Sequence, residues 1–521
     1  MVHYDSIVIG GGFNSLVAAS ILGQSGKKVL LLEAREQIGG LASTVEFVPG
    51  FQCNLINDVV KWIDPRVIKK LNLESHGLSF HSPDIVRIAL DTQGKHISFF
   101  RNSNDTARSI ANYSEEDAKV WTDFTKYINR CASFLEKLYE LAPPKLPNIR
   151  FKEMLSMSSM LAPIRKYGTR GLVDFMRVAP MTMLDLMDEW FEAEFLRSAI
   201  STAGIHHLSF GPYAAGTGFN LLHQHVHGKG VFHNAHFVKG GTKQLMDAVI
   251  ISAESANVEI RINTKVTSIN VKNGICSGVT LESGEILHSE QTVSGLDPNN
   301  TFVDLVGPLE LNPSFFTQIR NIRYRGSIAR IHFTLNELPE IKGISKEQMG
   351  TVFSVSPSIE YLERASDSVK YGQIAANPYV EFTIPSVLNS DFAPNGKHVL
   401  SATVQYAPYH LRDRDWSGEL KSHLKNNVVE VLENYIPRFS SFIDSSIVWS
   451  PVDFENQFGL TEGNLNHGEM TLDQFMFMRP TMSAARYESP IKNLYLCGSG
   501  AHPGGGIHGT NGFNAARRIL K

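Results

Sequence analysis

The first thirty-three residues alternate short apolar runs with a segment of helical periodicity. Residues 6–9 and 29–32 predict two short buried strands, and the apolar positions between them predict a helix that begins near Phe13 or Asn14. Gly26 stands where the left-handed C-terminal cap of that helix belongs. The pattern therefore predicts a strand–helix–strand unit with parallel strands.

Similar patterns recur to the end of the chain. Residues 85–90 and 96–100 predict the two strands of a β-hairpin, and residues 115–200 predict mainly helix. Ser114 and Asp117 have the spacing of a capping pair at the start of this helical part. The remaining runs predict strands at 258–262, from 266 and at 494–497, a helix after the glycine pair within 238–249, and a closing helix at 513–520.

Composition and charge narrow the class of protein. The chain has 521 residues, enough for about two to four domains, and a net charge of −3 that gives no indication of a nucleic-acid partner. No run of 18 apolar residues predicts a membrane-spanning helix, and the N-terminus lacks the basic start of a signal peptide. Four scattered cysteines without a C-x-x-C pair favour reduced thiols in a cytoplasmic protein.

Three glycines, Gly10, Gly11 and Gly12, lie between the first predicted strand and its helix. In dinucleotide-binding folds such glycines permit a tight turn and let the backbone approach a pyrophosphate at the positive end of the helix dipole. Glu33 follows Gly12 by 21 residues, where a carboxylate binds ribose hydroxyls. Ser15 occupies the third glycine position, which requires a small residue for helix–strand packing. We therefore predict a dinucleotide-binding site.

The residues after Glu33 distinguish FAD from NAD. Gly39-Gly40 and Ser43-Thr44 follow the ribose-binding carboxylate, an arrangement that resembles the FAD-binding start of the flavin amine oxidase superfamily. A second glycine-rich signature occupies residues 493–521, and NAD dehydrogenases have no reason to carry it. Because no second strand–glycine–helix unit with a trailing acid is visible, an NAD(P)H domain is not expected.

Together these motifs resemble the carotenoid (phytoene) desaturase family, whose relatives include retinol saturases and prolycopene isomerases. Residues 459–480 and 497–506 are similar to a subgroup named for a pyridine nucleotide-disulfide oxidoreductase domain. Residues 61–234 and 301–450 match the family weakly. Thr510-Asn511 stands where relatives tend to have Ala-Pro, which makes the loop beside the flavin less predictable.

The resemblance implies an α/β fold, in which a Rossmann-like FAD-binding domain of the glutathione reductase/amine oxidase type carries an inserted α+β substrate domain. The helical part of that inserted domain is expected at about 115–200. The expected division is a discontinuous FAD-binding domain at 1–60, 235–300 and 455–521, and a substrate domain at 61–234 and 301–454.

The resemblance also assigns contacts with FAD. It implies that the backbone of Val266 contacts adenine and that the C-terminal glycines pass beside the pyrophosphate and the flavin ring. The cofactor-binding candidates are Gly10, Gly11, Gly12, Asn14, Ser15, Glu33, Ala34, Arg35, Gly40, Leu41, Val266, Gly498, Gly505, Gly506 and Ile507.

Histidines cluster before residue 230. His223, His225 and His227 alternate, yet their surroundings predict a helix end on which His223 and His227 are four residues apart. No carboxylate lies nearby in sequence, so we expect no metal, and structural histidines are the simplest interpretation. Because the corresponding segment of the family approaches the flavin, His223 and His225 are the weak candidates for proton transfer. No other catalytic residue is identified.

Methionines and basic residues gather in the predicted helical part. Met154, Met157 and Met160 recur at helical spacing, which suits core packing, the simpler interpretation, or the wall of a tunnel for a long apolar substrate. A solvated basic face explains the cations, with loose membrane contact as the alternative. These cations are Lys152, Arg165, Lys166, Arg170 and Arg177.

The resemblance implies an FAD-dependent oxidoreductase that takes a hydride from an apolar substrate onto flavin N5, as a desaturase or dehydrogenase of a carotenoid-like or lipid-like compound. The electrons would pass to oxygen or a quinone. A redox-neutral isomerase or a saturase on the same scaffold is one alternative. A prenyl-binding chaperone of the GDP-dissociation-inhibitor type, which needs no flavin, is another. The sequence leaves the oligomeric state open.

Overall fold

Two seven-stranded sheets organise the chain in the computed structural model, which describes residues 3–144, 161–228 and 234–521. The strands are β1 (His3–Ile9), β2 (Val29–Leu32), β3 (Thr44–Val48), β4 (Phe51–Asn54), β5 (Phe80–His81), β6 (Ile85–Leu90), β7 (His96–Phe100), β8 (Phe237–Val238), β9 (Glu259–Arg261), β10 (Val266–Lys272), β11 (Ile275–Leu281), β12 (Ile286–Ser294), β13 (Ile328–Leu335), β14 (Phe353–Val355), β15 (Tyr379–Thr383), β16 (His398–Gln405), β17 (Ile443–Trp449) and β18 (Leu494–Leu496).

The α-helices lie between and around these strands, and several short 3-10 turns connect them. The helices are α1 (Phe13–Gln24), α2 (Pro65–Leu71), α3 (Ser103–Ala111), α4 (Glu115–Glu140), α6 (Leu161–Val178), α7 (Met183–Asp188), α8 (Glu194–Ile205), α9 (Thr217–Gln224), α10 (Thr242–Ser255), α11 (Pro313–Arg320), α12 (Ile359–Lys370), α13 (Gly418–Glu433), α14 (Phe439–Phe442), α15 (Pro451–Phe458) and α16 (Thr510–Ile519).

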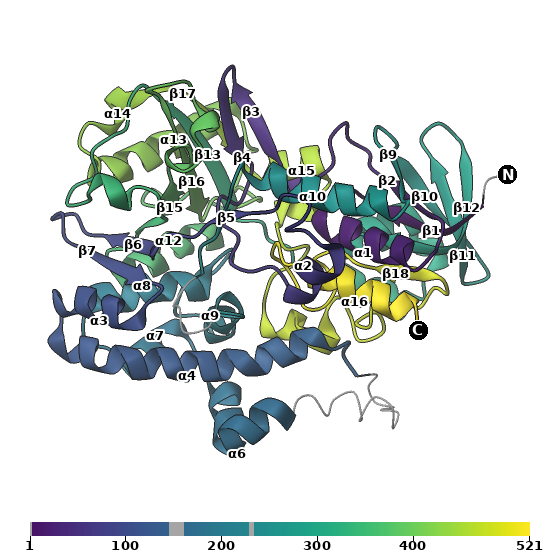
Figure 1. Ribbon diagram of the computed structural model, residues 1–521, viewed down its shortest axis with the longest axis horizontal. Coiled ribbons are helices and arrows are strands. Elements are labelled where there is room, and N and C mark those ends of the chain that lie inside the picture. Colours follow the sequence, from purple (N-terminus) through teal and green to yellow (C-terminus); the bar gives the residue numbers. More distant parts are fainter. Residues whose placement is uncertain (1–2, 145–160, 229–233) are drawn as a thin grey trace.

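The first sheet has the strand order β10-β11-β12-β1-β2-β9, with β18 paired to β12. Strands β9, β2, β1, β12 and β18 run parallel, and β10 and β11 are antiparallel additions. All four residues of β2 are buried, which is why this strand is an uninterrupted apolar run. Helix α1 packs against α10 and α16, so the first and last helices of the chain lie side by side (Figure 1).

The second sheet has the order β17-β13-β16-β15-β14-β6-β7 and lies at the opposite end of the molecule from β1 and α16 (Figure 1). Its pairs are antiparallel except for β14 with β6. Helices α3, α4, α7, α8 and α9 lie beneath it, and α6 projects from the bottom of the view. The fold is thus α/β with a Rossmann-like sheet and a mixed α+β part; the predicted domain boundaries stay a prediction.

Several predicted elements are confirmed, and three details are wrong. Strands β2, β6 and β7 have the predicted bounds, and Gly26 has a φ of 86°. Helix α16 begins at Thr510, earlier than predicted, because Nδ1 of His508 accepts a hydrogen bond from the Thr510 N–H at 3.2 Å. Helix α9 ends at Gln224, and His227 has a φ of 58°, so His223 and His227 do not share a helical face.

The third detail concerns the start of α4. Oγ of Ser114 accepts a hydrogen bond from the Asp117 N–H at 3.1 Å, as a cap should. The Asp117 carboxylate does not return this bond within the helix. It accepts hydrogen bonds from the backbone N–H groups of Glu192 and Ala193 at 2.9 and 2.8 Å, because it is buried beneath the loop between α7 and α8. Ser114 and Asp117 therefore form half of the predicted pair.

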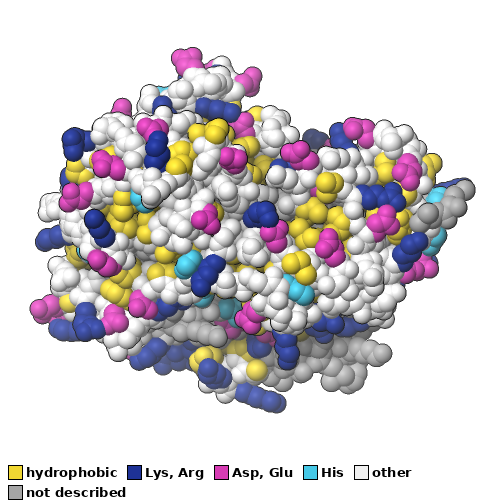
Figure 2. Space-filling model, turned by 45° about the horizontal axis from the view of Figure 1, so that its top comes forward, with side chains coloured by type: hydrophobic (Ala, Val, Ile, Leu, Met, Phe, Trp, Pro, Cys, Tyr) yellow, Lys and Arg dark blue, Asp and Glu magenta, His cyan; other side chains and the backbone are white. Residues whose placement is uncertain are grey.

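Acidic and basic side chains are interspersed over the face shown in Figure 2, without a large area of one sign. Within the described ranges, no helix is long and apolar enough to cross a membrane. The methionines from Met154 to Met160, together with Lys152, lie outside the described residues, so the two explanations for them stay open.

Candidate functional site

The turn between β1 and α1 presents backbone to a cavity. Gly10 has a φ of 90°, which lets the chain reverse directly after the strand. Gly12 is the N-cap of α1, and a Cβ placed on it would meet none of the described atoms within 4 Å. Because the helix N-terminus leaves N–H groups and a positive dipole end at this open space, an anionic group of the size of a pyrophosphate fits here.

Glu33 follows β2 and holds this turn in place. Its Oε2 accepts a hydrogen bond from the Gly11 N–H at 2.6 Å, and its Oε1 accepts one from the Arg35 N–H at 2.9 Å. The side chain is buried at the cavity wall. The carboxylate thus joins the ends of β1 and β2 and has lone pairs left for a ribose hydroxyl.

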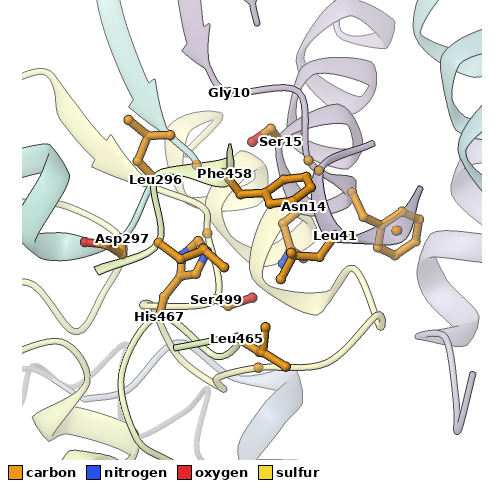
Figure 3. Close-up of a pocket in the computed structure, with 18 of the residues that line it drawn as sticks. Gly10, Asn14, Ser15, Leu41, Leu296, Asp297, Phe458, Leu465, His467 and Ser499 are labelled. Atoms are coloured by element: carbon orange, nitrogen blue, oxygen red, sulfur yellow. The ribbon is translucent and has the colours of Figure 1, made fainter. Parts of the chain in front are cut away.

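Two polar side chains beside the turn have buried atoms that lack hydrogen-bond partners in the described part of the chain. These atoms are Oδ1 of Asn14 and Nη1 of Arg35. The Arg35 guanidinium stacks over the Phe458 ring at 4.2 Å, and burial lowers its pKa. Figure 3 shows Asn14, Leu41 and Phe458 around the same space. Unpaired polar atoms at an open, glycine-lined wall indicate a site shaped for a polar ligand.

The serine in place of the third glycine has a structural partner. A Cβ on Gly295, just after β12, would lie 1.9 Å from Oγ of Ser15. The glycine that permits close packing of helix and strand is therefore Gly295, after the strand, and not a residue of the helix. This arrangement explains how α1 packs closely against the sheet with Ser15 in the fingerprint.

The C-terminal glycine loop lies against the same cavity, and Asn511 holds it. The Asn511 side-chain amide donates to the carbonyl oxygens of Gly498, Ala501 and Gly504 at 3.1, 2.9 and 3.2 Å. Thr510 Oγ1 donates to Oδ2 of Asp64 at 3.1 Å. The two residues that depart from the family pattern thus fix the loop by side-chain hydrogen bonds.

A cavity of about 710 Å³ connects these features. Every cofactor-binding candidate from Gly10 to Ile507 lines it, so the structure brings together residues from both ends of the chain and Val266 from the middle. Their individual contacts with FAD stay predictions. The cavity is within the size range of a cofactor site, and its wall combines backbone N–H groups, a ribose-side carboxylate and apolar side chains. These residues fit FAD.

The inner end of the cavity contains residues that the sequence did not single out. Lys61 Nζ donates a hydrogen bond to Oε1 of Gln224, and both side chains line the cavity. Trp62 stacks on His508 with ring centroids 4.5 Å apart and an interplanar angle of 3°. A Lys-Trp pair between apolar residues is no recognisable site motif in the sequence. Only the fold brings this pair next to the C-terminal loop.

The two histidine candidates have different positions. His223 lines the cavity, and its Nδ1 lies 2.6 Å from the Tyr139 hydroxyl. Burial, together with the nearby His508, Lys61 and Arg479, lowers the pKa of His223 to about 3. His225 is not a lining residue of the described cavity; its Nδ1 lies 2.7 Å from the Leu221 carbonyl oxygen, and burial lowers its pKa to about 4. Only His223 is placed to contact a ligand.

The described ranges contain no group of three or more His, Cys, Asp or Glu side chains that could hold a metal ion. His206 and His207 stack on each other at 3.9 Å instead of converging on a common point.

Comparisons with known proteins agree with this site. Residues 16–520 match the family described as flavin containing amine oxidoreductase. The chain is 30% identical to pyridine nucleotide-disulfide oxidoreductase domain-containing protein 2 of Rattus norvegicus, over 100% of this chain and 94% of the relative. It is 25% identical to a lycopene-forming phytoene desaturase of Paracoccus sp., over 97% of this chain and 95% of the relative.

A solved structure has the same fold. An oxidoreductase from Methanosarcina mazei aligns with a TM-score of 0.60 and 15% identity, over 100% of both chains. The match of the family over almost the whole chain, together with the full-length relatives, identifies the cofactor of the cavity as FAD. The chain belongs to the flavin-containing amine oxidoreductase family and is an FAD-dependent oxidoreductase.

Proposed function

We propose that this oxidoreductase is a desaturase-like dehydrogenase of an apolar substrate. A substrate C–H bond loses a hydride, the neighbouring carbon loses a proton, and a C=C bond forms. Oxygen or a quinone then takes up the two electrons. The similarity to the Paracoccus phytoene desaturase along 97% of this chain supports this reaction class.

The aromatic side chains at one end of the cavity are the observation that carries the proposal. Trp62, His223 and His508 line the cavity there, and Tyr139 packs against Trp62 and His223. FAD, when bound, supplies hydride acceptance at flavin N5. The surrounding rings exclude water and orient an apolar carbon chain, and the Tyr139–His223 pair can hold or move a proton at Nδ1 of His223.

Anaerobic flavin bleaching tests the proposal. FAD-loaded protein is mixed with a panel of polyenes, long-chain alkenes, retinoids and amines, and the visible flavin absorbance is followed. We expect an apolar C–H donor to bleach the flavin, and oxygen or a quinone to restore its colour. Conversion only after chemical reduction of the flavin would instead assign a saturase. Conversion without net flavin reduction would assign an isomerase, and bleaching by amines alone an amine oxidase.

We also propose a cytoplasmic location with loose membrane contact through α6. All four cysteines are free and buried, which supports a reducing compartment. On α6, the side chains of Val173 and Met176 are 62% and 65% exposed, and Arg170 and Arg177 beside them are exposed as well. A helix face with exposed apolar residues flanked by cations suits the interface of an anionic membrane.

Vesicle co-sedimentation tests this contact. We expect the protein to sediment with vesicles that contain phosphatidylserine, and the double variant Val173→Ser/Met176→Ser to stay in the supernatant. Val120→Ser, at an exposed apolar position on α4, is the matched control and should sediment like the wild type. Equal sedimentation of both variants would exclude α6 as the contact.

A further inference from the structure

A second, smaller cavity of about 50 Å³ adjoins the inner end of the FAD cavity. Lys61, His206 and His207 line both spaces. The far wall comes from the second sheet, with Arg87 on β6 and Glu381 on β15. Charged side chains therefore border the place where a substrate would lie, although the proposed reaction concerns an apolar carbon chain.

Most of these charges cancel in pairs. Arg87 Nη2 lies 2.5 Å from Oε2 of Glu381, and Arg330 Nη2 lies 2.8 Å from Oδ2 of Asp58. The Arg330 and Asp58 side chains are each 3% exposed. The hydroxyl of Thr383 donates a further hydrogen bond to the Asp58 carboxylate at 2.9 Å. These two ion pairs leave little net charge on the far wall.

Lys61 is not part of such a pair. Among the described residues, no carboxylate oxygen lies within 4.0 Å of its Nζ, and its hydrogen bond goes to the neutral amide of Gln224. An ammonium group has three donors, and the bond to Gln224 uses one of them. Asn220 lies on the same helix and within 3.4 Å of the Gln224 amide, which orients Gln224 toward Lys61.

Burying the Lys61 amine costs free energy, and a hydrocarbon ligand would increase this cost. A hydrocarbon covering the amine would remove its water and offer no acceptor, whereas an anion would pair with it. Burial lowers the pKa of Lys61 to about 7, with Glu381 raising it and Arg87 lowering it. Burial lowers the pKa of the adjoining His207 to about 3, so this ring is neutral and adds no competing charge.

We propose that the substrate carries a carboxylate, which Lys61 binds where the two cavities meet. A cavity of about 50 Å³ has room for a group the size of a carboxylate, since one water occupies about 30 Å³ of liquid. The substrate is thus an apolar chain with an acidic end. The inference rests on the proposed function and names its substrate class.

Flavin absorbance in the FAD-loaded protein provides a direct binding test. Octanoate and 1-octanol are titrated separately, and the perturbation of the visible flavin band gives each dissociation constant. We expect octanoate to bind at least tenfold more tightly than 1-octanol. Lys61→Met should abolish this preference without weakening the binding of 1-octanol. Lys239→Met, at an exposed lysine outside both cavities, is the matched control and should keep the preference.

A second variant covers the case in which Lys61→Met fails to fold. Gln224→Glu supplies an internal carboxylate for Lys61, and it should abolish the octanoate preference while FAD stays bound. Equal binding of octanoate and 1-octanol to the wild type would overturn the proposal, as would a preference that survives in both variants. Binding is read without turnover: an octanoate preference without bleaching by any C–H donor would overturn the dehydrogenase proposal alone.

Discussion

At the scale of single residues, the cavity depends on side chains whose hydrogen-bond partners are backbone groups. Glu33 accepts from two N–H groups on different segments, and Asn511 donates to three carbonyl oxygens. Such side chains specify the backbone positions that a cofactor requires, and losing one leaves buried partners unsatisfied. Lys61 differs, because its partner is a single neutral amide.

Replacing Glu33 with Gln removes one acceptor oxygen, so either the Gly11 or the Arg35 N–H loses its partner. We expect FAD affinity to fall about tenfold or more, since an unsatisfied buried donor costs about 1–3 kcal/mol. Titration of apoprotein with FAD, followed by flavin fluorescence, measures this loss. Glu36→Gln, at an exposed position nearby, should bind like the wild type. Equal affinity of E33Q and the wild type would contradict the assigned role.

The buried amine of Lys61 makes stability depend on pH. Its pKa is about 7 in the folded chain, against 10.5 for an ordinary lysine. Between these two values the unfolded chain binds a proton that the folded chain does not, so wild-type stability rises as pH increases through this window.

Lys61→Met removes this titration. We expect the variant to be more stable than the wild type by roughly 4 kcal/mol at pH 7, because the lysine pKa falls from 10.5 to about 7 on folding and one pKa unit is worth about 1.4 kcal/mol. The gap should narrow as pH approaches the ordinary lysine value of 10.5. Denaturant unfolding of the FAD-loaded proteins at both ends of this window measures it. A variant less stable than the wild type at pH 7 would make Lys61 a stabilising residue instead.

At the scale of elements, close crossings of helix and strand position the cofactor turn. Ser15 on α1 fits against Gly295 after β12, and Gly512 on α16 allows the backbone of Asn14 to approach. A Cβ on Gly512 would lie 2.0 Å from the Asn14 carbonyl oxygen. The N-terminal and C-terminal helices are therefore packed at backbone distance where both meet the cavity.

Gly295→Ala should destabilise the protein by about 1–3 kcal/mol through overpacking against Ser15. Because the clash is with a side chain, adding Ser15→Gly should restore most of the loss. Gly512→Ala clashes with backbone, so the same second change should not rescue it. Thermal unfolding of the three single variants, Ser15→Gly included, and of the two double variants compares these effects. If the stability losses of Gly295→Ala and Ser15→Gly simply add in the double variant, the two residues do not pack against each other as described.

The glycine loop offers a second test at this scale. Asn511→Ala removes three contacts to loop carbonyls, and we expect the flavin content of purified protein to fall about tenfold or more, at roughly 1 kcal/mol for each hydrogen bond. Asn514→Ala is the control, since Asn514 lies on the same helix but donates to Tyr139 and Tyr487. Absorbance of the purified proteins gives the flavin content. Equal loss in both variants would point to general damage to α16.

At the scale of the whole molecule, the cavity joins parts that belong to different cores. Glycines beside β1 and β18 form one wall, and Lys61, His207 and Asn220 form another. A ligand in this space contacts the Rossmann-like sheet and the helical part together. We therefore expect the binding energy of FAD and substrate to be shared by both parts.

Loading with FAD should therefore stabilise the molecule as one unit. At free FAD about 1,000-fold above its dissociation constant, the expected gain is about 4 kcal/mol. Calorimetry of apoprotein and FAD-loaded protein measures it, and we expect a single transition that moves upward with FAD. A second transition that keeps its temperature would show that one of the two parts unfolds independently of the cofactor.

The sequence predicted what local pattern determines. Strands β2, β6 and β7 have the expected bounds because each is a short apolar run between turn residues. The FAD candidates follow from spacing and family resemblance. Spacing and resemblance could not identify Lys61, because its role depends on its contact with Gln224 and on ion pairs that involve the second sheet. The close packing of Ser15 against Gly295 likewise joins segments that are distant in sequence, so it could not be predicted either.

The pairing of β18 with β12 sets the order of events during translation. β18 is made after every other described strand, and it inserts beside the carboxyl half of β12, which was made some 200 residues earlier. Until then the loop that Asn511 secures does not exist, and the nascent chain has only half of its cofactor wall. We therefore expect flavin to be incorporated only after β18 has been made, so a cell short of riboflavin should accumulate full-length apoprotein.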